Sequence, residues 1–137
     1  MTLVQNFPLF SIILSLFCAV ISFALNQNFP RRITIFLLSA SMVMQAATLL
    51  FCQQGNLSYD YMMGHYPAPW GNEITVGVLE CVMALLFAFV MLLSVLGGME
   101  HILHDVTPTR QRLYWVMVDL THAALLALCY TNDLFTA

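Results

Sequence analysis

The chain has 137 residues, of which 61% are hydrophobic and only 8% are charged, and its mean hydropathy is +0.83. Because soluble domains average about 25% charged residues, this composition is typical of a membrane protein. The net charge is −3, there is no lysine, and the arginines form no basic cluster, which excludes a nucleic-acid-binding surface.

The first predicted membrane span covers residues 8–25, which contain no charge. At 1.5 Å per residue, this length lies at the lower end of what crosses a hydrocarbon core of ~30 Å. Pro8 suits the first turn of a helix, where its missing N–H does no harm. The preceding residues contain no lysine or arginine, unlike the basic start of a signal peptide. We therefore expect a retained span.

A second span is predicted over residues 33–52, after a short polar connection that contains Pro30, Arg31 and Arg32. It is rich in serine, alanine and threonine, the small residues that allow helices to approach closely in lipid. Gln45 is its one strongly polar side chain. We interpret it as a partner in an interhelical hydrogen bond rather than as a functional residue.

The longest polar stretch, residues 53–72, is predicted to be an extended connection with an aromatic belt. A third span is predicted over residues 74–99, with its end marked by Gly97 and Gly98. Glu80 lies in its first two turns. Two interpretations of Glu80 are open, a carboxylate at the membrane interface or a proton carrier, and its place near a helix end favours the first.

The third connection, residues 100–112, holds side chains of the metal-ligating types at Glu100, His101, His104 and Asp105. Their spacing is nonspecific, so we predict a solvated loop and no metal site. The four cysteines are scattered, one in each span, with no C-x-x-C motif. This pattern predicts buried, small apolar residues and no cofactor in this chain.

The fourth span is predicted over residues 113–132, with Tyr114, Trp115 and Tyr130 as anchors at the membrane interface. Near its middle lie Asp119 and His122. A carboxylate in mid-membrane costs roughly 2.5–3.5 kcal/mol on insertion scales, so such a residue usually faces protein or a water path.

Because Asp119 and His122 are three residues apart, they share one helix face and could exchange a proton. Either they line an ion path, or His122 donates a hydrogen bond to Asp119 and the pair only fastens helices. No nucleophile motif and no glycine-rich phosphate loop is present, so no catalytic site is expected in the chain itself.

Together these features predict an all-α, multi-pass protein of the cell membrane, most simply the plasma membrane of a prokaryote, with residues 1–137 as one domain of four transmembrane helices. All the arginines lie in the first and third connections, which four spans place on the same side. The positive-inside rule puts these connections in the cytoplasm and both termini outside. Because apolar residues surround each helix, lipid or partner proteins must cover much of the surface.

Two motifs carry a resemblance to a known family. The ending TNDLFTA, with Asp133, Leu134 and Phe135, resembles the G-D-L-F-N-L segment that ends the fourth helix of antiporter-like membrane subunits, although Asn132 and Thr136 depart from that pattern. GHYPAPWG resembles the family's G-G-W-P-P-P-F-G-type loop before the third helix. The family comprises proton-pumping subunits of respiratory complex I, their relatives in membrane-bound hydrogenases, and D-type subunits of Mrp cation/proton antiporters.

The resemblance implies the N-terminal part, split or truncated, of a subunit in a proton- or cation-translocating complex. Family members use a glutamate on the fifth helix and a lysine on the seventh, and these 137 residues contain neither position. The implied role is scaffold and side wall, with other membrane subunits as partners, among them one that carries the fifth and later helices. The alternative is a self-contained four-helix scaffold or assembly protein without transport activity, which would leave TNDLF and PAPWG unexplained.

Overall fold

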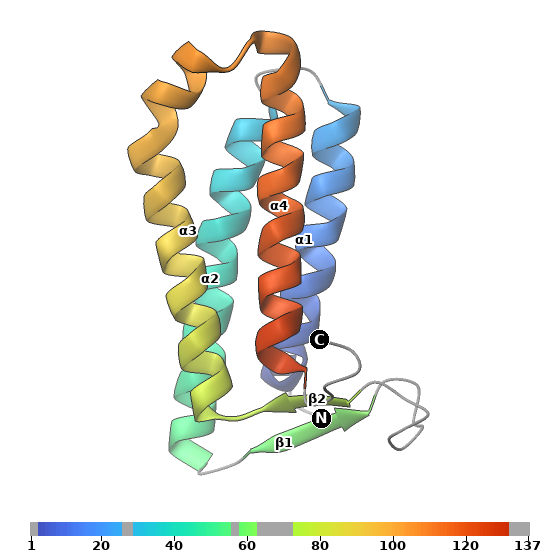
Figure 1. Ribbon diagram of the computed structural model, residues 1–137. Coiled ribbons are helices and arrows are strands. Elements are labelled where there is room, and N and C mark those ends of the chain that lie inside the picture. Colours follow the sequence, from blue (N-terminus) through green and yellow to red (C-terminus); the bar gives the residue numbers. More distant parts are fainter. Residues whose placement is uncertain (1–2, 26–28, 56–57, 63–72, 132–137) are drawn as a thin grey trace.

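Four long helices form an up-and-down bundle in the computed structural model, which describes residues 3–25, 29–55, 58–62 and 73–131 (Figure 1). Each is long and apolar enough to cross a membrane. The prediction of an all-α, multi-pass membrane protein with four spans is therefore confirmed. The helices are α1 (Phe7–Ala24), α2 (Phe29–Gly55), α3 (Val78–Asp105) and α4 (Pro108–Tyr130), preceded by a short 3-10 turn, η1 (Leu3–Asn6).

The two ends of the bundle differ in character. At one end, α1 and α3 finish while α2 and α4 begin (Figure 1), and the first five residues of α2 and α4 include Arg31, Arg32, Arg110 and Arg112. We call this the arginine end. At the other end, α1 begins and α4 finishes against a small sheet, and we call this the hairpin end (Figure 1). Within the bundle, α1 packs on α4 and α2, and α3 packs on α2 and α4.

The small sheet consists of two antiparallel strands, β1 (Tyr59–Met62) and β2 (Glu73–Val76). Ile74 also forms a bridge with Thr131, directly after α4. The Tyr59 hydroxyl donates a hydrogen bond of 2.9 Å to the Gln5 carbonyl oxygen, and burial raises the pKa of Tyr59, so this phenol remains a donor. The strands thus tie η1 and the end of α4 together.

The structure corrects the predicted start of the third span. Residues 74–76 belong to β2, and α3 begins only at Val78 after Gly77. The β-branched run Ile74–Thr75–Val76 favours a strand. The extended path predicted for residues 53–72 is found in β1, whereas α2 continues to Gly55. The GHYPAPWG motif lies outside the described residues.

The connections at the arginine end are also shorter than the sequence predicts. Gly97 and Gly98 do not end the third helix, since α3 continues to Asp105 and the chain turns at Val106 and Thr107. Likewise, Pro30 lies in the first turn of α2 rather than in a loop. In the first turn of a helix the backbone N–H groups have no partner within the helix, so proline, which lacks this group, is tolerated there. Pro30 and Pro108 occupy such positions. The solvated loop predicted over residues 100–112 is therefore mostly helical.

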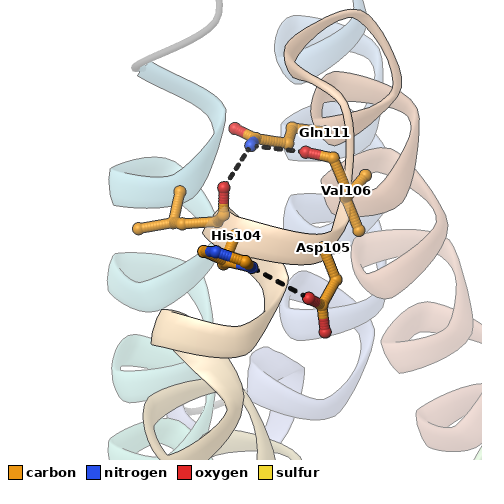
Figure 2. A network of polar contacts seen from close by, with 5 residues as sticks. His104, Asp105, Val106 and Gln111 are labelled. Atoms are coloured by element: carbon orange, nitrogen blue, oxygen red, sulfur yellow. Dashed lines mark hydrogen bonds and ion pairs between the residues drawn. The ribbon is translucent and has the colours of Figure 1, made fainter.

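Figure 2 shows how the tight turn between α3 and α4 is closed. Gln111 Nε2 donates hydrogen bonds to the carbonyl oxygens of Val106 and Leu103, at 2.9 and 3.3 Å. These bonds satisfy carbonyl groups that the end of α3 leaves without partners. Beside them, His104 Nδ1 lies 3.1 Å from Asp105 Oδ1, with both side chains exposed. Among the described residues, no three side chains of the types His, Cys, Asp and Glu converge on a common point.

Candidate functional site: a buried polar seam

Several polar side chains are buried inside the bundle, among apolar ones. Many large apolar side chains face outward on all four helices, with Phe36 69% and Leu79 70% exposed. The fully buried polar side chains lie on α1, α2 and α4; they are Ser11, Ser15, Ser22, Thr34, Ser41, Gln45, Thr48, Asp119 and His122. This distribution is the reverse of a soluble bundle and suits a protein whose outer surface meets lipid.

These nine residues, together with Tyr130, form what we call the polar seam. On α2 its members follow one another at intervals of three, four or seven residues, so they share one helix face. The serines of α1 are spaced in the same way. Thr34 and Thr48 are fourteen positions apart, which corresponds to ~21 Å of helix. It therefore extends through most of the thickness of a hydrocarbon core.

Asp119 is held in the seam by α1. Its Oδ2 accepts a hydrogen bond of 3.2 Å from Ser22 Oγ, and its backbone oxygen accepts one of 2.8 Å from Ser15 Oγ. The Thr34 side chain of α2 lies beside the same carboxyl group. Asp119 Oδ1 is buried and has no hydrogen-bond partner. One oxygen of the carboxyl group is thus paired and the other is free.

His122 lies about one turn further along α4 and is held by α2. Its Nε2 lies 2.8 Å from Ser41 Oγ, which either donates to it or accepts from it according to the tautomer. Its Nδ1 is buried without a partner. Asp119 and His122 both face the interior, but no direct hydrogen bond joins them. Asp119 is bonded to Ser22 of α1 and His122 to Ser41 of α2, so the two residues connect α4 to different helices.

Gln45 connects three helices. Its Nε2 donates a hydrogen bond of 3.0 Å to Ser11 Oγ on α1, and its Oε1 accepts one from the Tyr130 hydroxyl on α4. Ser11 Oγ in turn donates to the Pro8 carbonyl oxygen at 2.7 Å. The predicted interhelical hydrogen bond of Gln45 is confirmed.

The aromatic anchors predicted for the fourth helix need correction. Tyr130 and Trp115 are each only 1% exposed, because other elements cover them. The sequence could not reveal this, since apolar residues follow one another along most of α4 and do not mark which aromatic side chains face its neighbours. Tyr130 is therefore a member of the seam that the sequence missed.

Glu80 lies apart from Asp119 and His122, in the first turn of α3 at the hairpin end. Its side chain is partly buried and folds back over the helix start, since a Cβ atom added at Gly77 would lie 2.5 Å from Glu80 Oε2. Asp133, Leu134 and Phe135 lie outside the described residues.

The cysteines behave as small apolar residues. Cys18, Cys52 and Cys81 are buried and Cys129 is partly buried, and all four are free thiols. Cys52 and Cys81 pack in one apolar cluster with Tyr130. The predicted role of these side chains as buried packing residues is confirmed for the first three.

No protein-family model matches the chain. It is similar to NADH-quinone oxidoreductase subunit N of Desulforudis audaxviator strain MP104C, with 26% identity over 137 aligned positions that cover 95% of this chain and 26% of the relative. The chain thus spans about a quarter of the length of the relative it matches. This similarity supports the resemblance to antiporter-like subunits.

Proposed function

We propose that this chain is a membrane subunit, or the N-terminal part of one, in a proton- or cation-translocating complex of the NADH-quinone oxidoreductase type. The observation that carries the proposal is the similarity to subunit N over 95% of the chain. The bundle supports it, because its apolar surface suits a membrane and its polar seam suits the interior of a transport protein. We place the complex in the cell membrane of a prokaryote.

Within that complex, the four helices act mainly as scaffold and side wall. Gln45 on α2, and Asp119 and His122 on α4, each form a hydrogen bond to a neighbouring helix. These polar groups therefore stabilise the packing of the bundle. The exposed apolar side chains on α1, α2, α3 and α4 leave room for lipid and for further helices. We expect these helices to come from other membrane subunits, including a segment that corresponds to the remaining three quarters of the relative.

The proposal is tested by purifying the tagged chain from its native membranes in a mild detergent. Mass spectrometry then gives the mass of the chain and identifies the proteins that copurify, with an untagged strain as the control. We expect subunits of a quinone-oxidoreductase-type assembly. A lone protein of 15.4 kDa, or one bound only to unrelated membrane proteins, would contradict the proposal and support a self-contained scaffold.

A further inference from the structure

A groove lies on the outer surface of the bundle between α1 and α4, which pack side by side (Figure 1). Its volume is about 350 Å³, within the range of ligand sites. The lining residues Ala19 and Val116 are buried, whereas Val20, Phe23 and Leu120 are exposed around them. All five side chains are apolar, so this α1–α4 groove suits a hydrocarbon chain.

The apolar hollow continues along α1 toward the middle of the bundle. A second hollow adjoins the groove at Val20 and is also lined by Ile13, Leu16 and Phe17. Phe23 and Ile13 are ten positions apart, which corresponds to ~15 Å of helix. Because a hydrocarbon core is ~30 Å thick, one leaflet accounts for ~15 Å of it. The length of the hollow therefore matches an acyl chain in the leaflet at the arginine end.

An arginine lies beside the groove at the arginine end. The guanidinium carbon of Arg112 is 5.6 Å from the centre of the Phe23 ring, a cation–π contact that joins α4 to α1. Arg112, Val116 and Leu120 follow one another at intervals of four residues, so they share one face of α4. The positive charge is thus placed where the apolar groove meets the membrane interface.

Arg112 has no acidic partner in the described part of the chain. The one ion pair there joins His104 and Asp105 on α3, and α1 contains no charged residue. The Arg112 side chain is exposed, and its guanidinium group offers several N–H donors in a geometry that fits a phosphate group. Further positive charge at the same end comes from Arg31, Arg32 and Arg110.

Charge and length favour a lipid over a partner helix as the occupant of the groove. A phospholipid presents an anionic phosphate at the interface and an apolar chain within one leaflet, in the same order as Arg112 and the groove. A transmembrane helix crosses both leaflets and is mostly apolar, so it would leave Arg112 without an anion. Basic pockets between membrane helices are known to bind anionic headgroups.

We propose that the α1–α4 groove binds an anionic phospholipid. Arg112 donates hydrogen bonds to the phosphate oxygens, and one acyl chain lies over Ala19 and Val116 and continues along α1. The site depends on α1 and α4 alone, so it goes beyond the proposed function and does not require it.

Photo-cross-linking tests the site in the protein as isolated from native membranes, with whatever copurifies, after reconstitution into phosphatidylcholine vesicles. The vesicles also contain phosphatidylglycerol or phosphatidylcholine with a diazirine on one acyl chain, at equal mole fractions, and mass spectrometry locates the cross-links. We expect cross-links in residues 19–23 and 116–120, with phosphatidylglycerol giving the higher yield. Arg112→Gln should lower the ratio of the two yields about fivefold, the effect of one arginine near an anionic surface.

The matched control is Arg32→Gln, which removes the same charge from an exposed position of α2 at the same end. It should leave the ratio in the groove nearly unchanged, and Arg112→Lys, which keeps the charge, should retain most of the preference. Circular dichroism verifies that each variant is folded. The inference is overturned if the two lipids label the groove equally, if Arg32→Gln and Arg112→Gln have equal effects, or if no lipid labels the groove because a copurifying protein covers it.

Discussion

Gln45 shows what a single polar side chain contributes to this bundle. Its amide bonds Ser11 on α1 and Tyr130 on α4 while its own backbone belongs to α2. In lipid, the outer environment is as apolar as leucine, so helices associate through close packing and interhelical hydrogen bonds. A residue that joins three helices is therefore well placed to define how they pack.

We predict that Gln45→Leu lowers the free energy of unfolding by about 1–2 kcal/mol, because it leaves the Tyr130 hydroxyl without its acceptor in the interior. Unfolding by SDS in mixed micelles measures this change. The control is Thr121→Val, since the exposed Thr121 hydroxyl bonds only the Met117 carbonyl oxygen of its own helix. Equal effects of the two substitutions would contradict the structural role of Gln45.

Tyr130→Phe extends the same measurement. If the two side chains stabilise the bundle through their shared hydrogen bond, the double variant should lose less stability than the sum of the single variants, by at least about 0.5 kcal/mol. Strict additivity would mean that each residue acts through other contacts, such as the packing of the Tyr130 ring on Cys52 and Cys81.

The sequence alone identified part of the polar seam. Asp119, His122 and Gln45 stand out because charged or amide side chains are rare in apolar spans. The serines at positions 11, 15, 22 and 41 gave no such signal, since serine occurs on every face of a membrane helix. The direct pairing of Asp119 with His122 also failed as an interpretation, because Ser22 and Ser41 approach from helices distant in sequence. Those contacts depend on tertiary packing.

At the level of whole elements, hydropathy located all four helices but not their ends. The predicted end of the third span at Gly97 and Gly98 fails because a glycine costs only about 1 kcal/mol inside a helix, and the apolar sequence continues after it. Pro30 and residues 100–112 were predicted to lie in connections, yet Pro30 and Pro108 each lie at the start of a helix. Glycine, proline and charged residues thus show where an apolar segment ends, but a helix can continue beyond that point.

Gly97 offers a test of this explanation. A Cβ atom added there would meet nothing within 4 Å, so the position requires no glycine. We predict that Gly97→Ala raises the free energy of unfolding by up to about 1 kcal/mol, because alanine reduces the conformational entropy of the unfolded chain. Circular dichroism and SDS unfolding measure the change. A loss of helix content would instead indicate that α3 ends near Gly97 in the membrane.

Gln111 tests the turn between α3 and α4. We predict that Gln111→Ala lowers the free energy of unfolding by about 0.5–1 kcal/mol, since it removes the hydrogen bonds to the Val106 and Leu103 carbonyl oxygens (Figure 2). Amide hydrogen exchange should become faster in the last turn of α3. His104→Ala is the control, because its exposed contact with Asp105 should contribute little. Unchanged exchange in Gln111→Ala would contradict the capping role.

At the level of the whole molecule, the two ends of the bundle suggest opposite sides of a membrane. The chain has four arginines and no lysine, and all four arginines lie within the first five residues of α2 or α4. The hairpin end consequently has no arginine or lysine. The positive-inside rule operates on such short connections, so we expect the arginine end in the cytoplasm and β1 and β2 outside.

Labelling with a membrane-impermeant maleimide tests this orientation. Asp60→Cys at the hairpin end should react in intact cells, whereas His104→Cys at the arginine end should react only after the membrane is permeabilised. Both native side chains are exposed, so both new thiols should be accessible to the reagent. The unsubstituted protein is the control, since Cys18, Cys52 and Cys81 are buried and any labelling of the partly buried Cys129 is measured there and subtracted. Labelling of His104→Cys alone in intact cells would reverse the orientation and place Glu80, in the first turn of α3, on the cytoplasmic side.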